Sequence, residues 1–307
     1  MKQKFFGIVP PISTPVDENE RVDEKALRLL VDRCIEKGLQ GIFVAGTNGE
    51  CLALRQEERN RAIKIALDEA AGRVPVMAGC MDTSSERVID NIKAAEQMGI
   101  ETVVVTPEFY ARHNTADETI RHFEKVASRT EADIFIYNIP PFTGYTIPAD
   151  SVFKIAEFDH IVGYKDTSGQ FGEFMRCLEH FKGTDFMLFQ GMTQYAGLSI
   201  LLGADGCIPN IGPVVPELCL KVYEYAKKRD IDKMMAYNSL LLEAQRSLTI
   251  AKYGIAGCKA VESELFGFMS DRMCAPAEPV TADQRARITA AIKSVEERRM
   301  ALDAELA

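Results

Sequence analysis

The sequence has little positive charge and few of the residues that build metal centres. Its 45 aspartates and glutamates outnumber 36 lysines and arginines, giving a formal net charge of −9. An acidic chain without a Lys/Arg run is a poor ligand for phosphate backbones, so we expect no nucleic-acid partner. The four histidines are scattered and form no HExxH pattern, which argues against a zinc enzyme. We therefore expect neither a metal nor another cofactor.

Long apolar runs and paired cysteine motifs are also missing. No uninterrupted apolar segment is long enough to span a bilayer. Residues 1–11 begin with lysines and an apolar patch, but prolines interrupt the patch and no small-residue cleavage pattern follows. The eight cysteines form no CxxC pair and lie in apolar segments, which is typical of buried free thiols. These features predict a soluble, cytoplasmic protein with no membrane partner.

Short runs rich in valine and isoleucine alternate with segments of helical periodicity. The predicted strands are residues 6–9, 41–45, 74–78, 102–105, 134–137, 161–164, 187–189 and 206–208. The clearest predicted helices are residues 23–37, 56–71, 84–98, 230–249 and 282–306, the last two joined by an irregular stretch. Ser and Thr near several helix starts, such as those in residues 83–86, are suited to capping.

The alternation predicts an α/β protein with a parallel sheet covered on both faces. A doubly wound open sheet and a (β/α)8 TIM barrel both satisfy this pattern. Eight strands within the first 225 residues favour the barrel, and no GxGxxG motif follows the first strand. We predict a (β/α)8 barrel over residues 1–225 and a helical C-terminal extension over residues 226–307, packed on the barrel.

In such barrels the chemistry lies where the strands end. The strand ends that carry polar or reactive groups are residues 46–50, 106–110, 137–140, 165–167, 190–193 and 207–210. Lys165 closes a short apolar strand, where losing hydration lowers a lysine's pKa. A neutral amine can attack a ketone and form a Schiff base. The alternatives are an ion pair with Asp166 or an amine that reaches water.

Two further strand ends could assist a Schiff-base lysine. Tyr137 ends the preceding strand, and its phenol could move protons, although a packed aromatic with a satisfied hydroxyl is also consistent. Residues 46–49 (Gly-Thr-Asn-Gly) could bind a carboxylate through exposed N–H groups, or could simply form a turn.

Three motifs occur together at these strand ends: residues 46–50 (GTNGE), 137–140 (YNIP) and 163–168 (GYKDTS). Their order and spacing resemble the dihydrodipicolinate synthase / N-acetylneuraminate lyase family along nearly the whole chain. The resemblance implies a (β/α)8-barrel class I aldolase or lyase that forms a lysine Schiff base with pyruvate or another 2-oxo acid. It also implies a homotetramer built as a dimer of dimers.

The resemblance assigns roles to individual residues. Lys165 would form the Schiff base and Tyr137 would shuttle protons. Thr47 and Asn48 would hold the substrate carboxylate, with Thr47 also bonded to Tyr137. Tyr110, in a loop of residues 108–114 that is longer than usual, would extend the proton relay across a dimer interface. The remaining positions, Gly191 and Ile208, would line the pyruvate pocket, whereas Glu50 would be structural.

Two departures from the family pattern concern the second substrate. Phe142 stands where dihydrodipicolinate synthases have an arginine for the acceptor's carboxylate, and a phenyl ring cannot form that forked pair. In sialic acid lyases the glycine after the seventh strand is followed by Tyr, Asp and Glu, which bind sugar hydroxyls. The matching run here is residues 191–194 (Gly-Met-Thr-Gln), which has no carboxylate. The wall is therefore less polar, although Thr193 and Gln194 could bind a few hydroxyls.

These observations predict a lyase that cleaves a 4-hydroxy-2-oxo acid or a 2-keto-3-deoxy sugar acid to pyruvate and an aldehyde. Three alternatives stay open: condensation of pyruvate with aspartate semialdehyde, as in 4-hydroxy-tetrahydrodipicolinate synthase; a keto-deoxy acid dehydratase; and a non-catalytic sensor of 2-oxo acids. A metal-dependent aldolase is disfavoured because the sequence offers no evident ligand cluster.

Overall fold

Eight parallel strands form the centre of the computed structural model, which describes residues 5–110 and 115–306. The strands are β1 (Gly7–Ile8), β2 (Ile42–Val44), β3 (Val76–Gly79), β4 (Thr102–Val105), β5 (Asp133–Asn138), β6 (Ile161–Asp166), β7 (Met187–Gln190) and β8 (Gly206–Cys207). Each pairs with its neighbour in sequence from β2 to β8, and β8 pairs with β1. All eight predicted strands are confirmed.

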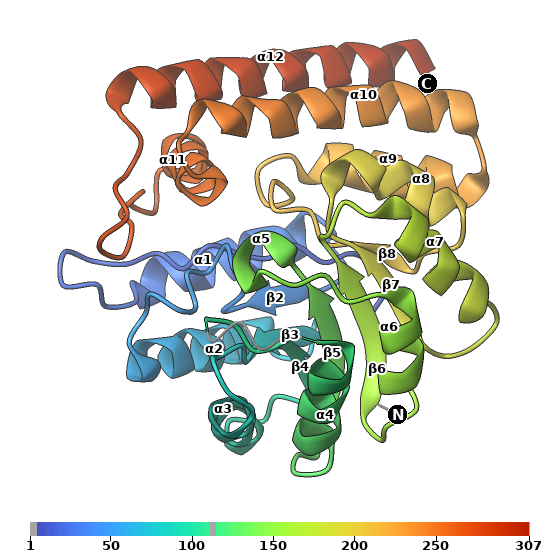
Figure 1. The fold of residues 1–307 in the computed structure, drawn as a ribbon. Coiled ribbons are helices and arrows are strands. Elements are labelled where there is room, and N and C mark those ends of the chain that lie inside the picture. Colours follow the sequence, from blue (N-terminus) through green and yellow to red (C-terminus); the bar gives the residue numbers. More distant parts are fainter. Residues whose placement is uncertain (1–4, 111–114, 307) are drawn as a thin grey trace.

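The segment that follows β1 closes the sheet against β2. Phe43 donates its N–H to the Pro10 carbonyl and accepts the N–H of Ile12, both at 3.0 Å. Pro11 itself pairs with Phe43 as an isolated parallel bridge. Because prolines lack an N–H, they suit the short edge of β1. These contacts close the eight strands into a ring, which confirms the TIM barrel over the open sheet. Figure 1 shows the helices around the strands.

Large apolar side chains fill the barrel interior, as this fold requires. The interior cluster comprises Phe5, Val9, Phe43, Met77, Val104, Phe135, Tyr137, Ile139, Met187, Phe189 and Ile208. Gly163 makes room for one of its rings, since a Cβ there would lie 2.5 Å from the Phe135 ring. Tyr137 and Ile208 belong to this cluster, so the interior packing reaches directly up to the candidate site.

Helices follow the strands and cover the outside of the barrel. The principal ones are α1 (Glu24–Glu36), α2 (Gln56–Ala70), α3 (Ser85–Gln97), α4 (Ala116–Ala127), α6 (Ala149–Ile155), α7 (Phe171–His180), α8 (Ala196–Leu201) and α9 (Pro216–Lys228). Ser84 caps α3 by accepting the N–H of Arg87, as its position predicts. All eight cysteines are buried free thiols, which confirms that prediction.

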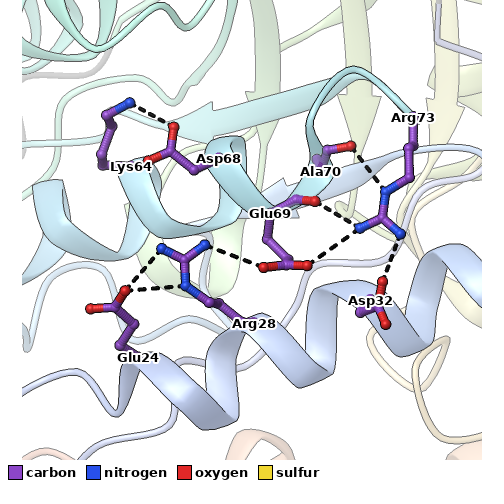
Figure 2. Close-up of polar contacts among 8 residues, drawn as sticks. All are labelled: Glu24, Arg28, Asp32, Lys64, Asp68, Glu69, Ala70 and Arg73. Atoms are coloured by element: carbon purple, nitrogen blue, oxygen red, sulfur yellow. Dashed lines mark hydrogen bonds and ion pairs between the residues drawn. The ribbon is translucent and has the colours of Figure 1, made fainter.

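Ion pairs join the first two barrel helices on their solvent side (Figure 2). Arg28 of α1 contacts Glu69 of α2 at 3.2 Å, and Arg73, just beyond α2, reaches Asp32 of α1 at 2.6 Å. These partners are partly exposed, so each pair contributes at most about 1 kcal/mol. Burial of the apolar faces therefore stabilises this helix pair more than its surface charges do.

The C-terminal extension contains α10 (Ile231–Ser247), α11 (Gly254–Phe266) and α12 (Ala282–Leu306). Figure 1 shows α10 and α12 lying side by side across one end of the molecule. The prediction of an irregular stretch between them was wrong in part, because α11 occupies 13 of its residues. Burial of Ala256 to Glu262 without a break removes the amphipathic pattern by which a helix is recognised. The division at residue 225 stays a prediction, and that residue lies within α9.

Candidate active site

Lys165 lies on β6 with only 3% of its surface exposed. No described carboxylate forms an ion pair with its Nζ, and the neighbouring Asp166 points to the other face of the strand. There Asp166 accepts hydrogen bonds from Tyr164 at 2.9 Å and Asn138 at 3.0 Å. The structure therefore shows neither an ion pair with Asp166 nor an amine at the protein surface.

Two aromatic rings surround the Lys165 amine. Its Nζ lies 3.8 Å from the centre of the Tyr137 ring and 4.8 Å from that of Phe43. Burial disfavours the ammonium form and lowers the pKa of Lys165 from its ordinary value of 10.5 to about 7. Near neutral pH this lysine is consequently divided between the charged form and the nucleophilic neutral amine.

Tyr137 stands directly opposite Lys165 in the parallel pairing of β5 with β6. Burial raises the pKa of its phenol to about 12, and the adjacent hydroxyls of Thr47 and Thr167 oppose that rise. The phenol therefore keeps its proton until a reacting group accepts it. Its neighbours Thr47 and Thr167 come from the ends of two other strands, so the sheet brings this group together.

The turn that follows β2 presents Thr47 and Asn48. No described residue accepts a hydrogen bond from the backbone N–H groups of these two residues, which leaves two donors for a ligand. The Asn48 side chain donates to the carbonyls of Pro11 at 3.3 Å and Asn210 at 3.2 Å, which fixes the turn. At the end of the turn, buried Glu50 pairs with Lys259 of α11, in agreement with a structural role.

Gly191 is the residue that allows β7 to pass close to Lys165. A Cβ at this position would lie 2.1 Å from the Thr167 hydroxyl and 3.2 Å from the Lys165 Cε. The Gly191 N–H donates to the Asp166 carbonyl at 2.7 Å, so the backbone cannot easily retreat. Any side chain here would disturb the reactive amine, which explains why glycine occupies the position.

A cavity of about 680 Å³ opens above Lys165. Eight of the nine predicted site residues line it: Thr47, Asn48, Tyr137, Phe142, Lys165, Gly191, Thr193 and Ile208. Tyr110 is the exception, because it is 91% exposed and does not line this cavity. Its backbone is left-handed, with φ of 80°. The rest of its predicted long loop, residues 111–114, lies outside the described residues.

Part of the cavity wall comes from the C-terminal extension, which sequence reasoning did not include. These residues are Gln245 of α10, Lys252 to Ile255 at the start of α11, and Met273 to Ala277. The Thr193 hydroxyl donates to Gln245 Oε1 at 3.1 Å, so the two walls are bonded together. Phe109 and Met81, near the ends of β4 and β3, were also missed. Their positions just after predicted strands could have identified them.

A comparison with protein families agrees with this geometry: the model of the dihydrodipicolinate synthetase family matches residues 4–295. The chain belongs to this family. Its members include lyases and aldolases, so the chain is an enzyme of that type. The family thereby accounts for both the closed barrel and the helical extension, because the match continues through α11 into α12.

Similar proteins within the family carry two different names. The chain is 31% identical over 291 residues to the 4-hydroxy-tetrahydrodipicolinate synthase of Methanopyrus kandleri, covering 94% of this chain and 96% of that protein. It is 30% identical over 242 residues to YagE of Escherichia coli, to which 2-dehydro-3-deoxy-D-gluconate aldolase activity is provisionally ascribed; 78% of this chain and 80% of YagE are covered.

Solved structures show the same fold. The crystal structure of YagE in complex with pyruvate superposes with a TM-score of 0.90 and 26% identity, covering 96% of this chain and 99% of that one. Dihydrodipicolinate synthase from Aquifex aeolicus gives a TM-score of 0.88 and 25% identity, covering 95% and 98%. The described part of the chain has no helix long and apolar enough to cross a membrane.

Proposed function

We propose that this enzyme cleaves a 4-hydroxy-2-oxo acid to pyruvate and an aldehyde through a Schiff base on Lys165. The observation that carries the proposal is a buried, unpaired lysine with a pKa of about 7 at the floor of a 680 Å³ cavity. A lysine in this state supplies the neutral amine that imine formation requires. Binding alone would not need such an amine, which argues against a non-catalytic sensor.

The substrate carboxylate binds at the turn after β2. The free backbone N–H groups of Thr47 and Asn48 would donate to it, with the Thr47 hydroxyl beside them. Gly191 and Ile208 would bound the remaining space around the 2-oxo group. This position would place the ketone carbon against the Lys165 amine.

The chemistry then uses groups around Lys165. The amine adds to the C2 ketone, and loss of water gives an iminium ion. The C3–C4 bond breaks: its electron pair moves into the iminium to form an enamine, while the 4-hydroxyl loses its proton and becomes the aldehyde. The centre of the Tyr137 ring lies 3.8 Å from the Lys165 Nζ, so Tyr137 is placed to relay that proton. Protonation of the enamine at C3 and hydrolysis release pyruvate and restore the lysine.

Borohydride trapping tests this mechanism. The protein is incubated with pyruvate and sodium borohydride, and its intact mass and peptide map are recorded. We expect one reduced pyruvyl adduct on Lys165, and none in Lys165→Ala. Folded wild-type protein that remains unmodified by both pyruvate and larger 2-oxo acids would overturn the proposal. Full activity after EDTA treatment is expected, in contrast to a metal-dependent aldolase.

Two other reactions are alternatives to this cleavage. Condensation of pyruvate with aspartate semialdehyde is the reaction of the synthases, but Phe142 offers that substrate's carboxylate no charge. Dehydration of a keto-deoxy acid would use the same Schiff base. Product analysis with each substrate separates the three, because only the lyase releases an aldehyde.

The proposal includes a cytoplasmic homotetramer, a dimer of dimers. A tyrosine that is 91% exposed, such as Tyr110, is suited to a contact with a second subunit, where it could extend the proton relay. Light scattering after size exclusion measures the assembly, and we expect the mass of four chains. Tyr110→Ala is expected to shift the population toward smaller species.

A further inference from the structure

We propose that the outer part of the cavity is an apolar subsite for an aldehyde with an aromatic body. This inference rests on the proposed function, because it names the aldehyde that the Schiff-base reaction releases or takes up. The reaction would join pyruvate and an aryl aldehyde into a 4-aryl-4-hydroxy-2-oxobutanoate, and would reverse it. The enamine C3 attacks the aldehyde carbon, whose oxygen gains the proton, so no oxidant or reductant is needed.

Apolar side chains from four separate segments line the cavity. Phe142 of α5 (Pro140–Thr143) is 61% exposed, and Tyr253 before α11 is 47% exposed. Met192 after β7 and Met273 complete the wall. Leaving large rings in contact with water is unfavourable unless a ligand covers them. Their shared position on one cavity indicates a ligand with matching apolar surface.

Several polar side chains of the wall are already bonded within the protein. The Thr143 hydroxyl is the donor toward the carbonyls of Ile139 and Tyr145, at 3.2 and 3.0 Å. Thr193 is bonded to Gln245 at 3.1 Å. These two threonine hydroxyls are therefore less available to the hydroxyl groups of a sugar acid, and a hydroxyl that is buried without a partner is costly. An aryl group makes no such demand and can pack against the rings of Phe142 and Tyr253.

The size of the cavity is consistent with this class of ligand. A volume of about 680 Å³ lies within the range of small-molecule sites and has room for a pyruvyl group with a phenyl ring attached. Lys252 and Gln194 lie at the rim, where they can face water while the ring lies inside.

Aldehyde competition in the synthetic direction tests the subsite. With pyruvate present, we expect kcat/KM for benzaldehyde to exceed that for glyceraldehyde by about tenfold. Phe142→Ala, and separately Tyr253→Ala, are each expected to lower this ratio by about tenfold. Phe6→Ala is the matched control: Phe6 is 54% exposed but lies outside the cavity, so the ratio is expected to stay unchanged.

Trapping of pyruvate on Lys165 in the same samples tests the Schiff-base mechanism separately from the aromatic subsite. A trapped adduct together with a preference for glyceraldehyde, unaffected by both alanine variants, would overturn the aromatic subsite and leave the Schiff-base mechanism intact. An absent adduct would instead refute the proposed function itself. A preference for benzaldehyde that both cavity variants reduce, and the Phe6 variant does not, would support the subsite.

Discussion

Two lysines of this protein are buried, but one has a carboxylate partner and the other lies against aromatic rings. Lys259 of α11 is completely buried, but it pairs with Glu50 and donates to the Arg272 carbonyl at 2.7 Å. Lys165 is nearly as buried and has no described carboxylate partner, only the rings of Tyr137 and Phe43. Burial alone therefore does not mark a reactive lysine. The absence of an acid partner is what leaves Lys165 available for chemistry.

The paired lysine also supports the site indirectly. Glu50 ends the turn that carries Thr47 and Asn48, and its second oxygen accepts the Cys274 N–H at 2.8 Å. The Glu50–Lys259 pair thus connects that turn to the extension and to the residue 273–277 wall of the cavity. We propose that Lys165 reacts, whereas Lys259 holds the surrounding walls in position.

Removing the unpaired lysine should give the largest effect on activity. We expect Lys165→Met to lower kcat by more than about a thousandfold, because the proposed imine forms on Lys165 and methionine has no amine. Urea unfolding should show a folded protein that is at least as stable, since an apolar side chain suits this pocket. Lys227→Met, at an exposed position on α9, is the control. Activity retained in Lys165→Met would show that the unpaired lysine is not the reactive group.

Removing the paired lysine should act on stability first. Lys259→Met leaves the Glu50 carboxylate buried without its cation, which should lower the free energy of unfolding by about 3–5 kcal/mol. Adding Glu50→Gln to this variant should restore part of the loss. Urea titrations of both variants measure this, and borohydride trapping of the single variant should still label Lys165. Loss of the Lys165 adduct in folded Lys259→Met would mean that Lys259 is also needed for imine formation.

The pH profile reports on Lys165 in the unmodified protein. With a pKa of about 7, Lys165 is mostly charged below that pH, so kcat/KM should rise about tenfold per unit and then level off. Between about 7 and its ordinary pKa of 10.5, the unfolded chain holds the additional proton, so stability should rise with pH. Urea titrations compare the native protein with Lys165→Met, which should lack this rise. A kcat/KM independent of pH from 6 to 8, roughly, would contradict the assignment.

The smallest effect concerns a cation added at the solvent-facing end of the cavity. Phe142→Arg should improve kcat/KM for aspartate semialdehyde by about tenfold, because an arginine can pair with its carboxylate. Phe142→Met is the uncharged control. Steady-state kinetics measure both, and equal values would show that position 142 does not select the acceptor.

The strand ends explain why much of the site could be predicted from the sequence. Thr47, Tyr137, Lys165 and Gly191 each follow or close an apolar run, and a parallel barrel brings such ends to one rim. Tyr110 was assigned from the family resemblance; it does not line the cavity of its own chain, and its role at a dimer interface stays a prediction. Tyr253 and Met273 follow no strand, so the same reasoning could not find them.

By itself, the sequence determined the alternation of strands and helices, the barrel, the free thiols and the reactive motifs, because these depend on local periodicity and on residues close together in the chain. Only the tertiary structure decided which lysine has a partner. Glu50 and Lys259 are separated by 209 positions, and their pairing follows from how α11 packs on the barrel. The same packing forms the apolar mouth of the cavity, since contacts between distant segments depend on shape and burial that no local pattern encodes.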